Sequence, residues 1–342
     1  MEILRAILLG AKVLLLDEAI TYLPIEEKRK FYKFIRAFAE KGGSVILITH
    51  KIYEAMDVAD RITVLRLGKV VGTVYASEVT INDVRKLMFA ERSSEITYER
   101  LAPGSPEENV LLSIRDLWVM GDFGDYAVRG ASLDVKPGEV VGIAGVAGNG
   151  QKELIQAIIG LGKVEGGAIV FEGEDITRKG TAYIRRKGVG YIPDLPAKYG
   201  VSLENTIEEN IAILPVFANI VIDWNRIRDL ALKLIEEYQI KIPSSLTPVK
   251  LLSGGNIMKV LVARELAVAK KLLISYNPTR ALDAATAIKV RKIIKEKAIK
   301  EKTGVLIASE DLDEIFQISD RIAVINSGKI VGIFEADKAD RK

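Results

Sequence analysis

The sequence predicts an α/β protein with a mainly parallel sheet, preceded by a partial copy of the same domain. Two observations support this fold class. Apolar, β-branched segments of strand length alternate with amphipathic helical segments, as in parallel strands joined by crossover helices. In addition, the segment that begins at Ser44 is matched without a gap by the segment that begins at Gly304.

The repeat relates "SVILITHKIYEAMDVADRITVLRLGKVVG" to "GVLIASEDLDEIFQISDRIAVINSGKIVG", at an offset of 304 − 44 = 260. Each copy is expected to fold as a strand, a helix and a hairpin of two antiparallel strands. Upstream the match continues at an offset of 259, with "ILRAILLGAKVLLLDEA" from Ile3 on "VARELAVAKKLLISYNP" from Val262. The beginning of the chain is therefore a partial copy of its C-terminal end.

These patterns divide the chain into three parts. Residues 1–90 are expected to form the incomplete first copy. Residues 91–108 are polar, with two prolines and no periodicity, and are expected to form a linker. Residues 109–342 are expected to form the second copy, with a more helical insertion at about 176–253.

The composition is that of a globular protein, with 49% hydrophobic and 28% charged residues. The formal net charge is only +3 and no block of like charge stands out, which argues against a nucleic-acid partner. The absence of cysteine excludes disulfides and thiolate metal sites. No apolar run reaches about 18 residues, so we expect a soluble or peripheral protein. Scarce glutamine and abundant Ile, Lys and Glu favour a thermophile.

The strand "GEVVGIAG" leads into a glycine-rich loop, "GVAGNGQKEL", and then a helix. This spacing is typical of a phosphate-binding loop, in which backbone N–H groups and the helix N-terminus hold phosphate. The lysine of that motif is replaced by Gln151, and its Ser or Thr by Lys152. A tight turn that needs glycine would explain the glycines equally well. The candidate nucleotide-binding residues are Gly145, Gly148, Asn149, Gly150, Gln151 and Lys152.

A second motif, "LLSGGNIMKVLVAREL", places Leu-Ser-Gly-Gly at the entry to a helix. Exposed N–H groups and a serine hydroxyl at this place can contact the γ-phosphate of a nucleotide held by a facing domain. A simple serine N-cap accounts for the serine but not for the whole string. The candidate residues are Ser253, Gly254, Gly255 and Asn256.

Together these motifs resemble the ATP-binding subunits of ABC importers of the simple-sugar and nucleoside class, in which two nucleotide-binding domains are fused. "GVAGNGQKEL", "LLSGGN", "NPTRALD" and "SEDLDEI" are similar to the second domain, and "GNGQ" favours the nucleoside branch. The resemblance covers nearly the whole chain. It implies a P-loop NTPase-like ABC ATPase domain that uses ATP and Mg²⁺.

The resemblance also implies roles for single residues. In "VLLLDEA", Asp17 is expected to hold Mg²⁺ through water and Glu18 to act as the base that polarises the attacking water. His50 is expected to sense the γ-phosphate, although a lone histidine is usually structural. Phe123 is expected to stack on adenine, the alternative being an aromatic at a strand edge. "YIPDLPAKYG", near Asp194, takes the place of the loop that senses the membrane partner, but departs from the class pattern after the proline.

The second copy replaces the residues that hydrolysis needs. Tyr276 falls opposite Asp17, Asn277 opposite Glu18, and Glu310 opposite His50. With Gln151 in place of the loop lysine, this pattern predicts a degenerate site that binds nucleotide weakly or regulates, without turnover.

No phosphate loop precedes Asp17 in the sequence; the offset places it at 145 − 259 = −114. We expect a truncated reading frame, or a separate polypeptide that supplies the loop. The chain alone is then expected to hydrolyse ATP very slowly or not at all. An unsatisfied sheet edge in residues 1–90 invites self-association.

The leading interpretation is an energy-coupling ATPase subunit, peripheral on the cytoplasmic face of the membrane. It would drive import of a simple sugar or nucleoside through permease subunits, with an extracytoplasmic substrate-binding protein as an indirect partner. The alternative is a non-catalytic nucleotide-binding regulatory or interaction protein. A soluble ABC protein of repair or translation is a third reading, disfavoured because basic or coiled-coil insertions are not visible.

Overall fold

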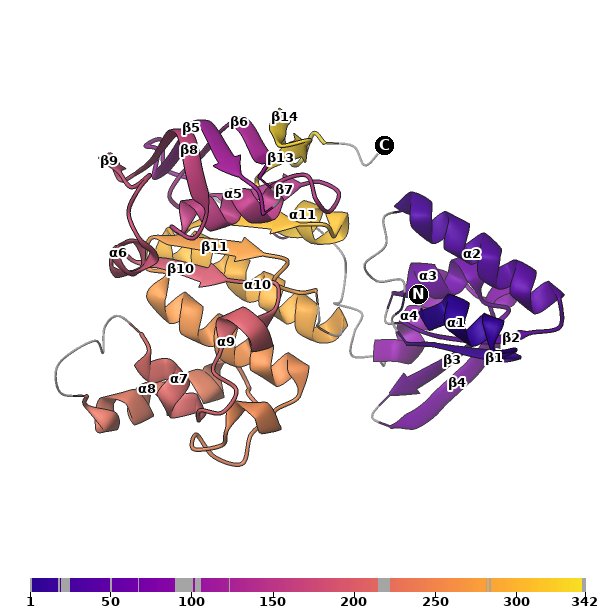
Figure 1. The fold of residues 1–342 in the computed structure, drawn as a ribbon. Coiled ribbons are helices and arrows are strands. Elements are labelled where there is room, and N and C mark those ends of the chain that lie inside the picture. The colour runs from indigo at the N-terminus through magenta and orange to yellow at the C-terminus, as the bar shows by residue number, and fades with distance from the viewer. Residues whose placement is uncertain are drawn as a thin grey trace. The chain divides into compact units, whose positions relative to one another are not determined.

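The computed structural model describes residues 2–17, 19, 25–49, 51–66, 68–89, 101, 106–122, 124–214, 222–280, 282 and 284–339. The chain forms two compact units, residues 1–97 and residues 98–342, here called unit 1 and unit 2 (Figure 1). Among the described residues, no helix combines the length and apolar character needed to cross a bilayer.

Unit 2 is built on a six-stranded sheet in the order β10-β11-β12-β7-β13-β14. Every neighbouring pair is parallel except β13 with β14, which forms an antiparallel hairpin at the edge. The mainly parallel sheet with an antiparallel edge is therefore as the sequence predicts. The strands are β7 (Val140–Ala144), β10 (Val189–Ile192), β11 (Leu272–Tyr276), β12 (Gly304–Ser309), β13 (Arg321–Asn326) and β14 (Lys329–Glu335).

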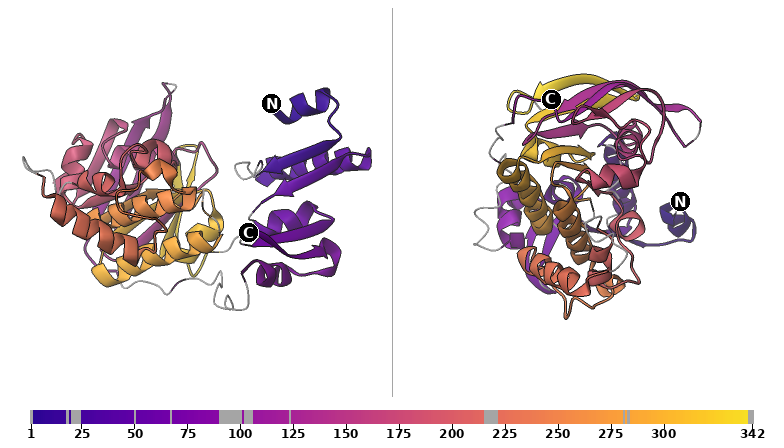
Figure 2. Two further views of the ribbon diagram at one scale, coloured as in Figure 1. Left: turned by 90° about the horizontal axis from the view of Figure 1, so that it is seen from below. Right: turned by 90° about the vertical axis from the view of Figure 1, so that its left-hand side faces the viewer.

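The two faces of this sheet are covered by different layers. One face packs on α5 and on a four-stranded antiparallel sheet in the order β6-β5-β8-β9; the other packs on α9, α10 and α11. Figure 1 shows the antiparallel sheet above and α9 and α10 below, and Figure 2 gives two further views. These elements are β5 (Leu112–Met120), β6 (Tyr126–Val135), α5 (Gln151–Ile158), β8 (Lys163–Phe171), β9 (Glu174–Asp175), α9 (Gly254–Val268), α10 (Ala284–Glu301) and α11 (Leu312–Ile318).

The segment between β9 and α9 is mostly helical but also contributes the edge strand β10. Its longer helices pack on α9 around a third apolar cluster that includes Ile207, Ile227 and Val260. The helices are α6 (Thr181–Arg186), a π-helical turn η3 (Pro196–Gly200), α7 (Ile207–Ala212), α8 (Trp224–Glu237) and a 3₁₀ turn η5 (Val249–Leu251).

Unit 1 contains two separate two-stranded sheets, β1-β2 and β3-β4. Its apolar residues form two small clusters, one around Leu14 and Leu16 and one around Ile62 and Val64. The elements are α1 (Glu2–Leu8), β1 (Val13–Asp17), α2 (Ile25–Glu40), β2 (Ser44–Ile48), α3 (Ile52–Val58), β3 (Arg61–Arg66), β4 (Lys69–Tyr75), a 3₁₀ turn η1 (Ala76–Glu78) and α4 (Ile81–Phe89).

The repeat in the sequence is reproduced residue by residue in the strand pairing. In unit 1, β1 runs parallel to β2 from Val13 opposite Ser44. In unit 2, β11 runs parallel to β12 from Leu272 opposite Gly304, which is the same register after the repeat offset. The hairpins β3-β4 and β13-β14 also share an irregularity after Val64 and Val324. Equivalent strands of the two copies therefore pair in the same register, as the gap-free alignment of the repeat predicts.

Unit 2 contains a central strand that has no counterpart among the described residues of unit 1. In unit 2, β7 pairs with both β12 and β13 and so joins them into one sheet. Among the described residues of unit 1, no strand joins β2 to β3. The described part of unit 1 also has no counterpart of α5 or of the four-stranded antiparallel sheet. Leu15 is 70% and Ile46 is 52% exposed, whereas their counterparts Ile274 and Leu306 are fully buried under α5 and that sheet.

Candidate nucleotide site

The glycine loop connects the buried strand β7 to α5, and its glycines are needed for two different reasons. Gly148 and Gly150 have φ values of 85° and 98°, which other residues rarely adopt. At Gly150 a Cβ atom would also lie 2.3 Å from the carbonyl oxygen of Ala127, whereas at Gly148 it would meet nothing within 4 Å. Gly145 is limited by packing, since a Cβ there would lie 2.8 Å from the carbonyl oxygen of Ile325. Positive φ at two of the positions and close backbone packing at two of them therefore require glycine here.

The side chain of Gln151 is turned into the loop. It is 2% exposed, and its Nε2 donates to the carbonyl oxygen of Val146 at 3.0 Å. The same carbonyl accepts from Asn149 Nδ2 at 2.9 Å, while Asn149 Oδ1 accepts from the Ser327 N–H at 2.7 Å. A neutral amide thus stabilises the loop at the position where the motif has an ammonium group.

Lys152 supplies the positive charge in the first turn of α5. Its Nζ lies 3.5 Å from Asp122 Oδ2, and its side chain is 42% exposed. It is also among the charges that lower the pKa of Asp194, although burial outweighs them and the net effect raises that pKa. The ammonium group therefore lies near two acidic side chains, Asp122 and Asp194.

The residues that follow β11 and β12 form one hydrogen-bonded cluster. Glu310 Oε1 accepts from the Tyr276 hydroxyl and from Asn277 Nδ2, both at 3.4 Å, and the Glu310 N–H donates to Asn277 Oδ1 at 3.0 Å. Burial, and then the nearby charges of Glu310 and Asp194, raise the pKa of Tyr276, so that its phenol stays protonated. Asn277 has a φ of 48°, a value that asparagine tolerates better than most residues.

Arg280 bridges two carboxylates in this cluster. Its NH1 lies 3.8 Å from Asp194 Oδ2 and 3.8 Å from Glu310 Oε1. The sequence places Arg280 within "NPTRALD", but this bridging role was not anticipated, because Asp194, Arg280 and Glu310 come from three distant loops. Asp122 was missed for the same reason.

The Ser-Gly-Gly motif forms the start of α9. The Ser253 hydroxyl accepts from the Asn256 N–H at 3.4 Å and from Asn256 Nδ2 at 3.1 Å, an N-cap. A Cβ on Gly254 or Gly255 would meet nothing within 4 Å. The first turn of α9 therefore has no close neighbours at its two glycines, and Ser253 is exposed. Most of the remainder of α9 is buried.

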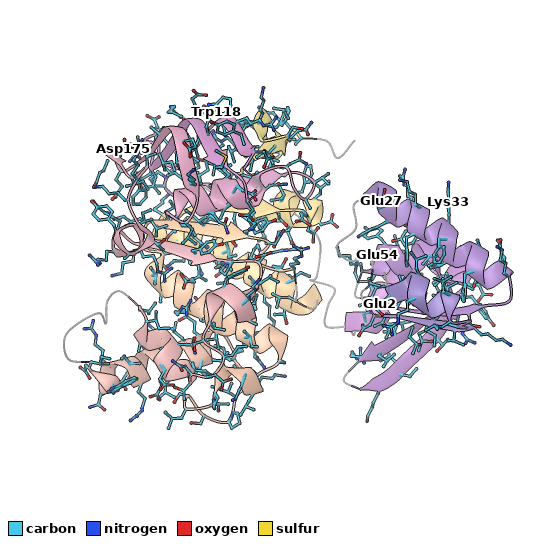
Figure 3. All side chains as sticks on the ribbon, in the orientation of Figure 1. Glu2, Glu27, Lys33, Glu54, Trp118 and Asp175 are labelled. Atoms are coloured by element: carbon cyan, nitrogen blue, oxygen red, sulfur yellow. The ribbon has the colours of Figure 1, made fainter. Side chains whose placement is uncertain are left out.

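In unit 1, Asp17 is exposed at the carboxyl end of β1. Glu18, His50 and Phe123 lie outside the described residues, so their expected roles stay predictions. The strand before position 50 ends at Ile48, and the hydroxyl of the next residue, Thr49, donates to the buried Glu54 at 2.8 Å. Glu54, labelled in Figure 3, also pairs with Lys28 at 2.7 Å. Among the described residues, no group of three or more Asp, Glu or His side chains could hold a metal ion.

Comparison with known proteins agrees with this geometry. Residues 128–280 match the family model described as ABC transporter. The chain is 38% identical to the nucleoside import ATP-binding protein NupA of Lactococcus lactis subsp. cremoris, over the whole chain and 68% of that protein. It is 37% identical to the guanosine import ATP-binding protein NupO of Bacillus subtilis, over 96% of the chain and 65% of that protein. It is 30% identical to the ribose import ATP-binding protein RbsA 1 of Rubrobacter xylanophilus, over the whole chain and 67% of that protein. The chain thus spans about two thirds of the length of these relatives.

Solved structures support the fold. One is an ATP-binding cassette of an ABC transporter in its ADP conformation, with a TM-score of 0.57, 25% identity, and coverage of 66% of this chain and 91% of that chain. Another is a dimeric ATP-binding cassette in a post-hydrolysis state with ADP and Pi, with a TM-score of 0.58, 21% identity, and coverage of 66% and 99%.

Proposed function

Because the chain belongs to the ATP-binding proteins of the ABC transporter family, we propose that it couples ATP to the import of a nucleoside or simple sugar through a membrane permease. Relatives named for nucleoside and guanosine import, at 38% and 37% identity, favour a nucleoside as the cargo. A ribose import relative at 30% keeps simple sugars as the second candidate.

One observation supports different roles for the two units. Asp17 and Tyr276 end equivalent strands in the same register, yet one is a carboxylate and the other a phenol. A carboxylate at this place can hold Mg²⁺, whereas a phenol that stays protonated cannot serve in the same way. Unit 1 is therefore the catalytic half, with Asp17 on Mg²⁺, Glu18 as the base and His50 as the γ-phosphate sensor.

Unit 2 complements that half. Its contribution is the start of α9, where Ser253, Gly254 and Gly255 would contact the γ-phosphate of a nucleotide. The buried remainder of α9 anchors this helix end: Glu265 accepts from Arg185 at 2.7 Å and from the Tyr191 N–H of β10 at 3.0 Å.

Unit 1 needs one further part to become a complete nucleotide-binding domain. By the internal repeat, that part is a strand that pairs with both β2 and β3, followed by a phosphate loop and a helix, as β7 and α5 provide in unit 2. Leu15 and Ile46 mark the face it would cover. The same bare face gives the isolated chain a route to self-association.

The working complex would include permease subunits that receive the conformational change and, indirectly, a substrate-binding protein outside the membrane. The chain would then sit peripherally on the cytoplasmic face.

A second function, nucleotide-dependent regulation without turnover, is favoured by the residues at the unit 2 loop. Gln151, Tyr276 and Glu310 leave that site without the lysine, carboxylate and histidine that hydrolysis uses there.

The test is ATP turnover by the purified chain, measured as phosphate release, alone and with a polypeptide that carries a strand, a complete G-x-x-G-x-G-K-[ST] loop and its helix. We expect negligible release from the chain alone, and release with the added polypeptide that Glu18→Gln abolishes. Turnover by the chain alone, insensitive to Glu18→Gln, would contradict the assignment of unit 1. Nucleotide binding without turnover under either condition would favour the regulatory function.

A further inference from the structure

The unit 2 loop keeps the parts that hold the first two phosphates of a nucleotide. In phosphate loops the glycine-rich backbone cradles the α- and β-phosphates, whereas the lysine reaches the β- and γ-phosphates and the Ser or Thr hydroxyl binds Mg²⁺. Gly148 and Gly150 retain the left-handed backbone of that cradle, and the loop leads into the first turn of α5. The side chains that differ from the motif are those that would contact the γ-phosphate and Mg²⁺.

Mg²⁺ does not fit this site. The Ser or Thr position of the phosphate loop is occupied by Lys152, whose ammonium group has no acceptor atom for a metal. The position equivalent to Asp17 is occupied by Tyr276, whose buried hydroxyl donates a hydrogen bond to Glu310. The nearby carboxylates are already engaged, Asp122 with Lys152 and Glu310 with Arg280.

The region next to the loop is also unfavourable for a third phosphate. Ser309 pairs with Ala144 on neighbouring parallel strands, so Glu310 and Gly145 are the next residues on strands that lie about 4.8 Å apart. The Glu310 backbone thus follows the strand next to β7, and its carboxylate is held toward Tyr276, Asn277 and Arg280, which follow or end β11. Asp194 adds a second carboxylate, and Arg280, at 3.8 Å from each, can balance only one of the two charges.

We propose that the unit 2 loop binds a nucleoside diphosphate without Mg²⁺, in preference to Mg²⁺–ATP. This inference rests on the proposed function, in which the loop is a nucleotide cradle. Lys152 supplies the positive charge that Mg²⁺ would otherwise bring to the β-phosphate. Glu310 sets the specificity, because its carboxylate repels a third phosphate that neither Mg²⁺ nor a loop lysine neutralises.

Titration calorimetry of the 342-residue chain tests this directly, with ADP and ATP, each in Mg²⁺ and in EDTA. We expect one ADP per chain, an ADP affinity that chelation leaves unchanged within about twofold, and ATP in EDTA bound at least about tenfold more weakly, a difference of about 1.4 kcal/mol. Glu310→Gln keeps the hydrogen-bonding shape and should reduce the preference for ADP by at least about threefold. Lys152→Met should weaken ADP binding.

The matched control is Glu335→Gln, which removes the same charge at the end of the edge strand β14. It should leave both affinities unchanged. Circular dichroism of each variant separates a loss of binding from a loss of folding.

Three results would overturn the inference: ATP binding as tight as ADP binding in EDTA, ADP binding that requires Mg²⁺, or a preference for ADP that Glu310→Gln does not alter. Tight Mg²⁺–ATP binding at the loop would overturn it while leaving the proposed transport function intact. That function fails separately, if added phosphate loop and permease never elicit turnover that depends on Glu18.

Discussion

Asp17 and Tyr276 occupy the same register position in the two units: Asp17 pairs with Ile48 at the end of β1-β2, and Tyr276 pairs with Ala308 at the end of β11-β12. The backbone of the repeat has thus been kept while the chemistry at the strand end has diverged. Tyr276 is buried and hydrogen-bonded to Glu310, whereas Asp17 is exposed. On this difference rests the proposal that unit 1 is catalytic and unit 2 supports it.

In an assembly that hydrolyses ATP, Asp17→Asn should lower turnover by at least about a hundredfold, because the carboxylate at this position helps to hold Mg²⁺. Tyr276→Phe should change turnover by less than about threefold, since it only removes a hydrogen bond of 3.4 Å. Steady-state phosphate release measures both. Equal losses in the two variants would contradict the division of labour.

Gly150→Ala should destabilise unit 2 more than Gly148→Ala. Both substitutions place a side chain at positive φ, at a cost of about 1–2 kcal/mol. At Gly150 the new Cβ would also lie 2.3 Å from a backbone oxygen, which adds about 1–3 kcal/mol. Urea unfolding followed by tryptophan fluorescence reports on unit 2 alone, because both tryptophans, Trp118 and Trp224, belong to it. Equal losses of unfolding free energy in the two variants would mean that the loop moves away from Ala127 to make room for the Gly150→Ala side chain.

Glu265→Ala should destabilise unit 2 by about 3–5 kcal/mol, because it leaves the buried Arg264 without its carboxylate. Glu265 is fully buried and also binds Arg185. The control is Glu204→Ala, which breaks an exposed pair with Lys250 and should cost less than about 1 kcal/mol. The same fluorescence experiment measures both, and similar losses would show that the buried pair contributes no more than a surface one.

The same carboxylate gives unit 2 a pH dependence. Burial raises the pKa of Glu265, but the charges of Arg264 and Arg185 outweigh it, so the net pKa lies below the usual 4.5. The unfolded chain therefore binds this proton first, and the stabilisation is present above pH 4.5 and is lost as the pH falls through the folded pKa. Unfolding measured between pH 6 and about pH 3 should show a shallower decline in Glu265→Gln than in the parent. Identical slopes would assign the acid sensitivity to other carboxylates.

Replacing Leu15 and Ile46 by lysine should reduce self-association of the chain, because both side chains lie exposed on the bare sheet face of unit 1. Sedimentation velocity over a range of concentrations provides the measurement. The control is Leu246→Lys, which removes an exposed leucine, 56% accessible, from unit 2. If the control dissociates the oligomer and the double variant does not, the contact lies outside the unit 1 face.

Much of the fold could be read from the sequence because its signals are local. The continuous apolar runs in "VLLLDEA" and "SVILIT" predict strands, and the repeat predicts that equivalent strands pair in the same way in both units. The loop could also be predicted from its glycines, because positive φ and close backbone packing allow few other residues there. Family membership followed from the spacing of these motifs.

The sequence by itself determined the repeat, the mainly parallel sheet, the glycine loop and the replacement of the charged groups at the equivalent positions of the second copy. Only the tertiary structure decided where those replacements point: Gln151 inward onto Val146, and Arg280 between Asp194 and Glu310. It also decided that Leu15 is bare where Ile274 is covered. The physical reason is that backbone periodicity depends on neighbours along the chain. Charge pairing and burial depend on groups that distant segments bring together in space.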